Sequence, residues 1–221
     1  MMEQYDEVLN RVLGVLVEGK LSGNQQKTMD ETAKTIPVGI SNRHAHLSRA
    51  DIDALFGEGY ELTKLKDLSQ PGQYACKECV TVCGPKGILE KIRVLGPSRP
   101  ETQIEILQGD TFKLGIKGEL RLSGDLSGTS GATVIGPKGS VQLKQGVIIA
   151  QRHIHMLPEE AKHFGVVDGQ RVKIECDGPR GGVLQNVVIR ATANSGLECH
   201  IDTEEANALG VTSSTRIDIL K

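Results

Sequence analysis

The first part of the chain carries apolar residues at helical spacing. They recur every three or four positions and are Tyr5, Val8, Leu9, Val12, Leu13 and Leu16. This period predicts one amphipathic helix over residues 3–21. The following residues 22–35 are polar and show no period, which predicts a flexible linker. The apolar stripe needs a partner, and the linker allows the helix to dock outside the main body.

From Ile36 onward, short runs rich in β-branched residues alternate with glycine turns. The predicted strands lie at residues 38–41, 79–82, 92–95, 102–106, 147–150, 171–174, 187–190 and 216–219. Helices are predicted where Ser, Thr or Pro is followed by acidic residues, at 48–56, 158–164 and 203–209. The pattern predicts a mainly β fold of small β-barrels with short capping helices.

Composition and charge narrow the class of protein. The 221 residues suffice to bury a core as one domain or two small ones, and the 26 glycines suit many tight turns. The formal net charge is -2, with Lys and Arg scattered, which argues against nucleic acid or a membrane surface as partner. No apolar stretch approaches the roughly 20 residues of a membrane span, and no signal peptide is recognisable. A cytosolic protein is predicted.

The five cysteines are predicted to be free thiols, because their number is odd and the compartment is reducing. Cys76, Cys79 and Cys83 resemble half of a structural zinc site but have no second pair at usable spacing. Core or surface thiols are the preferred interpretation. Cys199 precedes His200, so in a strand it is expected to face the opposite side.

An internal repeat organises the chain. Residues 40–47 (ISNRHAHL) align with residues 149–156 (IAQRHIHM), and a short acidic helix is expected after each copy. Further on, residues 84–87 (GPKG) match 178–181 (GPRG), and each precedes two predicted strands. The second of these strands carries Glu105 in one copy and His200 in the other. Two related, pseudo-symmetric halves, each a small β-barrel, are the simplest explanation.

The repeated His-x-His pattern predicts two metal sites. Alternate side chains of an extended chain share a face, so His44 and His46 point the same way, as do His153 and His155. Two imidazoles so placed can chelate zinc, which accepts nitrogen and carboxylate ligands and leaves a fourth position open in catalytic sites. The third ligands are then Glu105 and His200. A lone His-x-His is often an ordinary surface or core pair, but here five of the six histidines fall at repeated positions, His163 being the exception.

Several cationic and glycine-rich elements have two interpretations. Arg99 lies in a loop six residues before Glu105, where a guanidinium can grip an oxyanion, although a solvated arginine fits equally well. Lys86 and Arg93 are candidates for the phosphates of a larger ligand, with ordinary surface charges the alternative. Residues 123–131 (SGDLSGTSG) can cradle an anion through backbone amides or form a flexible loop, and they lack the P-loop pattern.

Three elements resemble the PduL-type phosphate acyltransferases, also called phosphate propanoyltransferases or phosphotransacylases. They are residues 39–48 (GISNRHAHLS), 95–105 (LGPSRPETQIE) and 151–156 (QRHIHM). The resemblance covers residues 36–220, and the first and third elements together are specific. It implies that His44, His46 and Glu105 hold one zinc ion and that His153, His155 and His200 hold the other. It also implies a catalytic, phosphate-binding Arg99 and a coenzyme A site lined by Ile40, Ser41, Asn42, Lys86, Arg93 and Asn207.

The resemblance also implies an architecture and a location. One β-barrel would combine residues 36–42 with 151–221, and residues 43–150 would form the second. Residues 1–35, the helix with its linker, look like the peptide that directs some family members into a bacterial microcompartment, where they serve propanediol degradation. Shell or cargo proteins would then be partners of the helix, and a helix that forms oligomers is the competing interpretation. A homo-oligomer, a dimer, is expected in the bacterial cytoplasm.

Three functions are compatible with these features. The first is transfer of a short acyl group, such as propanoyl, between coenzyme A and inorganic phosphate, without a Ser nucleophile because Gly-x-Ser-x-Gly is absent. The second is a zinc-dependent hydrolase of thioesters or phosphate esters, in which water replaces phosphate as nucleophile. The third is a non-catalytic, metal-stabilised scaffold, which predicts a fourth protein ligand at each site, whereas the repeat supplies three.

Overall fold

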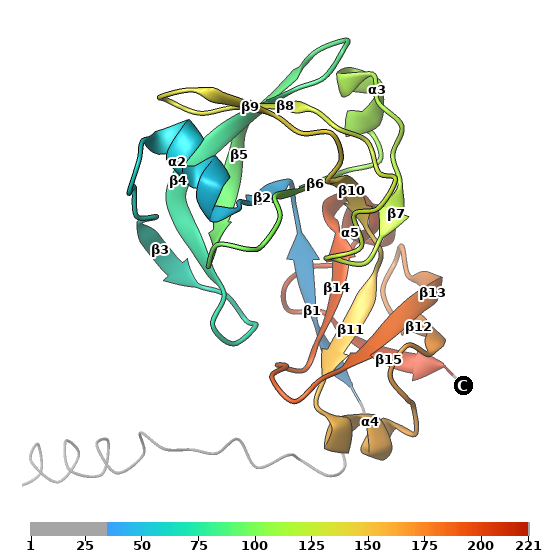
Figure 1. The fold of residues 1–221 in the computed structure, drawn as a ribbon. Coiled ribbons are helices and arrows are strands. Elements are labelled where there is room, and N and C mark those ends of the chain that lie inside the picture. The colour runs from blue at the N-terminus through green and yellow to red at the C-terminus, as the bar shows by residue number, and fades with distance from the viewer. Residues whose placement is uncertain (1–34, 221) are drawn as a thin grey trace, which may run out of the picture. The chain divides into compact units, whose positions relative to one another are not determined.

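The computed structural model describes residues 35–220, and the chain from Thr35 onward forms one compact unit. The helix expected at residues 3–21 and all of its linker except Thr35 lie outside the described residues. Within the described part the fold is mainly β, as predicted, with four short helices packed around two sheets (Figure 1). None of these helices combines the length and hydropathy needed to cross a membrane.

Six strands close into a barrel. In order around the barrel they are β1 (Ile36–Ser41), β14 (Glu198–Asp202), β11 (His153–Met156), β13 (Gly182–Ala191), β12 (Arg171–Cys176) and β15 (Arg216–Leu220). Helix α4 (Pro158–Phe164) follows β11, and helix α5 (Thr203–Leu209) follows β14. The first strand of the described chain thus pairs with strands from its end, as Figure 1 shows in blue and red.

The remaining nine strands form a second sheet that does not close. Their order is β7 (Leu120–Arg121), β10 (Val147–Ala150), β6 (Gln103–Ile106), β2 (His44–His46), β5 (Ile88–Gly96), β4 (Tyr74–Cys83), β8 (Thr133–Ile135) and β9 (Ser140–Gln142), with β3 (Lys64–Asp67) paired to β4. Helix α2 (Arg49–Phe56) follows β2, and helix α3 (Asp110–Leu114) follows β6.

The chain crosses between the two sheets at equivalent points of the repeat. Strand β1 of the barrel leads through Asn42 and Arg43 into β2 of the open sheet. Strand β10 of the open sheet leads through Gln151 and Arg152 into β11 of the barrel. The two strands that begin with histidine therefore follow the two crossings directly, one in each sheet.

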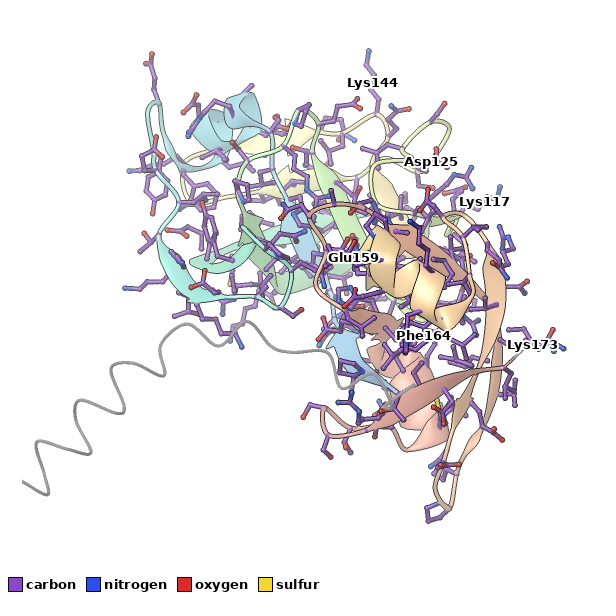
Figure 2. All side chains as sticks on the ribbon, turned by 90° about the horizontal axis from the view of Figure 1, so that it is seen from below. Lys117, Asp125, Lys144, Glu159, Phe164 and Lys173 are labelled. Atoms are coloured by element: carbon purple, nitrogen blue, oxygen red, sulfur yellow. The ribbon has the colours of Figure 1, made fainter. Side chains whose placement is uncertain are left out.

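Each sheet buries its own apolar cluster because its strands alternate. In β12, Val172, Ile174 and Cys176 are buried, while the residues between them are exposed. Figure 2 shows this outer side of β12 at Lys173, whereas Phe164 of α4 packs against the barrel core. The residue between the two histidines of each His-x-His strand follows the same rule. The side chains of Ala45 and Ile154 are fully buried, each in the core of its own sheet.

The three predicted helices are confirmed. Helices α4 and α5 have the predicted bounds, and α2 begins one residue later because Ser48 is its N-cap, whose hydroxyl accepts a hydrogen bond from the Asp51 N–H. Helix α3 was not predicted, because it spans five residues and its N-cap is Gly109 rather than a side chain that marks a helix start. The division of residues 36–221 into two domains stays a prediction.

Replacing Ile154 by Ala tests how far the barrel depends on the core side of β11. Because Ile154 is fully buried between two histidines, we expect the free energy of unfolding to fall by about 2–5 kcal/mol, measured by guanidinium denaturation. The matched control is Ile135→Ala, at a side chain that is 41% exposed, which should cost less than about 1 kcal/mol. Equal losses in the two variants would contradict this assignment of the core.

Candidate functional site

The first cluster of candidate ligands joins β2 and β6. These strands are antiparallel, and His44 lies directly opposite Glu105. The Nε2 atom of His44 lies 3.4 Å from Oε2 of Glu105. Together with His46, these residues offer three donor atoms that all lie within 4.8 Å of one another. The pairing of two strands about 60 residues apart in sequence thus adds the third ligand to the two that the His-x-His pattern supplies.

The second cluster joins β11 and β14 in the same way. His153 lies opposite His200 in an antiparallel pair, and the two rings stack edge to face. The Nε2 atoms of His153 and His155 lie 3.0 Å apart. The three histidines form the other group in the described chain whose donor atoms lie within 4.8 Å of one another. Both predicted ligand sets are thus brought together by the fold.

Equivalent backbone carbonyls orient the first histidine of each cluster. The Nδ1 atom of His44 lies 2.7 Å from the carbonyl oxygen of Asn42, and Nδ1 of His153 lies 2.8 Å from that of Gln151. A carbonyl only accepts hydrogen bonds, so each ring carries a proton on Nδ1, and in its neutral form it presents an unprotonated Nε2 to its cluster. This is the tautomer that a metal-binding histidine needs.

Burial keeps three of the histidines neutral. Burial, together with the charges of His44 and Arg99, lowers the pKa of His46 to about 3. Burial and the charge of His200 lower the pKa of His153 to about 4, and burial with the charges of both neighbouring histidines lowers that of His155 to about 3. At neutral pH these rings are therefore in the uncharged form that binds metal ions.

His44 and Glu105 shift each other's pKa values in opposite directions. Burial alone would lower the pKa of His44, but the adjacent carboxylate raises it above its ordinary value. Burial alone would raise the pKa of Glu105, but the charge and the hydrogen bond of His44 hold it well below its usual range. The carboxylate is thus ionised and available as an oxygen ligand.

The donor sets suit zinc. The Nδ1 atom of His46 is buried and has no hydrogen-bond partner, a costly situation that a bound cation would relieve. Two imidazoles with a carboxylate, and three imidazoles, are ligand sets that zinc accepts in tetrahedral sites with an open fourth position. His163, the histidine outside the repeat, belongs to neither group.

Both clusters face one cavity of about 480 Å³. Its walls include the predicted Arg99 and four of the residues predicted to contact coenzyme A, namely Ile40, Ser41, Asn42 and Arg93. The cavity walls that residues 35–220 form do not include Lys86 or Asn207. Arg93 donates hydrogen bonds to the carbonyls of Cys76 and Lys77, so its guanidinium also braces strand β4.

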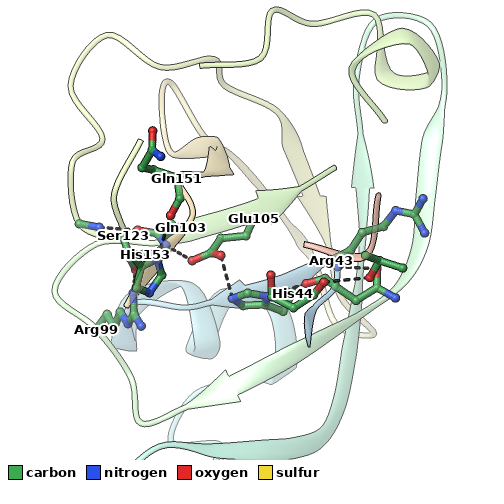
Figure 3. A network of polar contacts seen from close by, with 12 residues as sticks. Arg43, His44, Arg99, Gln103, Glu105, Ser123, Gln151 and His153 are labelled. Atoms are coloured by element: carbon green, nitrogen blue, oxygen red, sulfur yellow. Dashed lines mark hydrogen bonds and ion pairs between the residues drawn. The ribbon is translucent and has the colours of Figure 1, made fainter. Parts of the chain in front are cut away.

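A hydrogen-bond network links Arg99 to the first cluster (Figure 3). The Arg99 guanidinium donates to the Ser123 hydroxyl oxygen at 2.8 Å, and the Gln103 amide donates to the same oxygen at 2.8 Å. The Gln103 amide nitrogen also donates to Glu105 at 2.7 Å, while its oxygen accepts the Gly124 N–H. Because both acceptor positions of the hydroxyl are filled, its own proton is available to an anion in the cavity.

Sequence reasoning missed several residues of this site. Gln103 lies two positions before Glu105, so the alternation of the strand already places it on the ligand face. Arg190 lies opposite His155 on β13, a pairing that no sequence pattern indicates. Arg190 and Arg99 both line the cavity, and burial together with the positive charge of Arg190 lowers the pKa values of Arg99 and His155. Ser123 was included only as the start of the glycine-rich segment.

The cysteines have no part in the cavity. All five are free thiols, as predicted. Cys76, Cys176 and Cys199 are buried, and Cys199 faces the barrel core, on the side of β14 opposite His200. Among residues 35–220, no cysteine lines the cavity or joins a ligand group.

Comparison with known proteins assigns the chain to a family. The sequence model of the phosphate propanoyltransferases matches residues 37–212. The chain belongs to the phosphate propanoyltransferase family. It is 51% identical over 97% of both chains to the phosphate propanoyltransferase of Rhodobacter capsulatus. It is 48% identical over the full length of both chains to that of Rhodopseudomonas palustris, and 55% identical over 78% of its own length and 83% of the relative to that of Thermotoga maritima.

Membership of the phosphate propanoyltransferase family confirms the resemblance that the motifs carry, and it identifies the chain as an acyltransferase. The matched region contains both ligand clusters, Arg99 and Ser123. The family model begins at residue 37, after the expected N-terminal helix, while the relatives from Rhodobacter capsulatus and Rhodopseudomonas palustris align over 97% and 100% of the chain.

Gly39 provides a test of the second cluster. It lies beside His200 in the parallel pair of β1 and β14, and a Cβ atom there would lie 2.9 Å from Cδ2 of His200 and 2.7 Å from Cδ of Glu198. We expect Gly39→Ala to displace His200 and to raise the zinc Kd of this site about 10-fold, measured by competition with a chromophoric chelator. Gly182→Ala, whose Cβ would meet only Leu209 at 3.3 Å, is the control. Unchanged zinc affinity in Gly39→Ala would refute the assignment.

Proposed function

We propose that the protein transfers a short acyl group, propanoyl or one of similar size, between coenzyme A and inorganic phosphate. The observation that carries this proposal is the single cavity, into which both candidate zinc sites, Arg99 and Ser123 face. The names of the relatives support propanoyl as the acyl group. The alternative, a zinc-dependent hydrolase of thioesters or phosphate esters, uses the same ligand clusters, and a thioester hydrolase has no need of an anion site beside them.

The reaction is a direct displacement. A phosphate oxygen attacks the carbonyl carbon of the thioester, the new C–O bond forms and the C–S bond breaks. The products are an acyl phosphate and the thiolate of coenzyme A, which then takes up a proton. Because no cysteine lines the cavity that residues 35–220 form, the geometry supports direct transfer over a route through an acyl-cysteine.

The phosphate is held by Arg99 and Ser123. A guanidinium matches the geometry of an oxyanion, and the Ser123 hydroxyl has its proton free to donate to the same anion. Arg190 adds a second positive charge at the cavity. These groups orient the nucleophile, which turns a bimolecular encounter into a positioned one.

The two ligand clusters would hold the zinc ions. His44, His46 and Glu105 would hold one ion, and His153, His155 and His200 would hold the other, because each cluster brings three donor atoms within 4.8 Å of one another. When bound, zinc supplies a Lewis acid for the carbonyl oxygen and a soft partner for the departing thiolate. Gln103 keeps the Glu105 carboxylate in place, and the carbonyls of Asn42 and Gln151 keep the histidine rings in the ligand tautomer.

Coenzyme A enters along the end of β1. Ile40 is an exposed apolar side chain on the cavity wall, and Ser41 and Asn42 follow it toward the first ligand cluster. Arg93, beside His44 in the parallel pair of β2 and β5, supplies positive charge on the cavity wall. Lys86 and Asn207 would contact a part of the coenzyme outside the cavity walls that the described residues form.

The decisive test is an assay of coenzyme A release from propanoyl-CoA with and without phosphate, using zinc-loaded protein. We expect release to require phosphate and to yield propanoyl phosphate. Because Arg99 stabilises the charge of the nucleophile and the transition state, Arg99→Ala should lower kcat/KM about 100-fold, and His44→Ala should abolish activity. Arg171→Ala, at an exposed position of β12, is the matched arginine control and should retain activity.

The outcomes of this assay separate the candidates. Release of coenzyme A without phosphate would favour the hydrolase. Absence of turnover with every short acyl-CoA would reopen the possibility of a non-catalytic scaffold.

Ser123→Ala tests the hydroxyl separately. Loss of one hydrogen bond to a charged group should raise the KM for phosphate roughly 10-fold and leave the KM for propanoyl-CoA unchanged, as measured by steady-state kinetics. Thr133→Ala, which removes an exposed hydroxyl from β8, serves as the control. Equal effects on both KM values would show that the hydroxyl does not contact phosphate selectively.

The N-terminal segment is proposed to direct the enzyme into a bacterial microcompartment. Its expected amphipathic helix precedes the region that the family model matches, as a separable address would. Shell or cargo proteins of the compartment are then its partners, and a homodimer is the expected assembly. Deletion of residues 1–34 should leave phosphate-dependent activity intact while abolishing copurification with the compartment, and loss of the dimer instead would favour self-association through the helix.

A further inference from the structure

The arginine that precedes each His-x-His segment forms an ion pair with a carboxylate. Arg43 donates from Nε to Oδ2 of Asp110 at 2.6 Å (Figure 3). The same Oδ2 atom accepts the backbone N–H of Leu107 at 2.9 Å. Leu107 directly follows β6, the strand that carries Glu105. One carboxylate thus joins Arg43 to the end of the strand that supplies the third ligand.

The second copy repeats this arrangement. The Nε atom of Arg152 lies 2.9 Å from Oε1 of Glu205. Oε2 of Glu205 accepts the backbone N–H of Asp202 at 3.1 Å. Asp202 is the last residue of β14, the strand that carries His200.

The two arrangements have the same spacing. In each, the arginine directly precedes the first histidine, the backbone N–H belongs to the second residue after the third ligand, and the carboxylate belongs to the fifth. The acid is Asp in one copy and Glu in the other, so the contact recurs although the residue type differs. This recurrence favours a shared role over a chance surface ion pair.

The role of each arginine–carboxylate pair follows from its position in the fold. Arg43 and Arg152 lie where the chain crosses between the two sheets, and each ion pair ties that crossing to the end of the strand that carries the third ligand. Asp110 is 3% exposed, which makes its ion pair less screened than one on the surface. Each pair therefore fixes the distance between the two His ligands and the third ligand across the strand pair.

We infer that Arg43 and Arg152 are positioning residues, each of which holds one metal site in register through its carboxylate, Asp110 or Glu205. This inference rests on the metal sites of the proposed function. A positioning role can be distinguished from a general effect on protein stability. Loss of Arg43 must weaken zinc binding at the first site alone, and loss of Arg152 must weaken it at the second site alone.

The experiment measures zinc affinity at each site separately in the full chain. His153→Ala with His155→Ala isolates the first site, and His44→Ala with His46→Ala isolates the second. Into each background we would introduce Arg43→Ala, Arg152→Ala or Arg49→Ala. Arg49 is the matched control, because it forms a 2.6 Å ion pair with Asp53 and its side chain is 43% exposed against 39% for Arg43. Zinc Kd values come from competition with a chromophoric chelator.

Arg43→Ala should raise the zinc Kd of the first site about 10-fold and leave the second unchanged, and Arg152→Ala should do the reverse. Arg49→Ala should change neither. Asp110→Asn, which keeps an acceptor for the Leu107 N–H and removes the charge, should weaken the first site without unfolding the protein, as checked by its melting temperature. This variant keeps the test decisive if Arg43→Ala proves unstable.

Two outcomes would overturn the inference. If the parent protein binds two zinc ions and the arginine variants weaken both sites equally or neither, the pairs do not position the ligands, while the proposed function stands. If the parent binds no zinc, the proposed metal sites fail and the inference fails with them.

Discussion

The alternation of side chains along an extended strand is the constraint on which the site depends. In β2 and β11 one face carries two imidazoles, and the other carries a fully buried residue, Ala45 or Ile154. A shift of either strand by one residue would expose its core side chain and bury its ligands. Packing energy in the two cores therefore holds the histidines in register, so no separate loop is needed to position the ligands.

The repeat gives the two sites equal geometry but different charge. Glu105 and His200 occupy the same position opposite the first histidine of their clusters. The Glu105 carboxylate belongs to one donor set, whereas on the three-histidine side the Glu198 carboxylate contacts Nε2 of His200 from outside the donor set. Arg190 adds a positive charge on that side, opposite His155. Near-symmetric halves thus form an asymmetric cavity.

Local pattern was sufficient to predict the parts of the site that lie within one strand or recur in the repeat. The His-x-His pairs, Glu105 and His200 follow from period and alignment, and α4 and α5 follow from their first turns. The positions of the remaining site residues depend on contacts between segments that are distant in sequence. Arg190 comes to the cavity through the register of β11 with β13, and Ser123 through hydrogen bonds from Arg99 and Gln103. A single sequence does not specify such long-range register, and short strands such as β7 and β9 carry too few residues to show a period.

The charges at the cavity suit an anionic nucleophile. Zinc can activate water without a base, but the carboxylates on the walls formed by the described chain are already occupied, so none is free to act as a further base. Glu105 contacts His44 and Gln103, Glu198 accepts hydrogen bonds from His200 and Ser69, and Asp202 caps α5. Phosphate is an anion at neutral pH and needs no such base. A cavity that offers two guanidiniums and a hydroxyl proton, but no unoccupied carboxylate, suits a nucleophile that arrives with its negative charge.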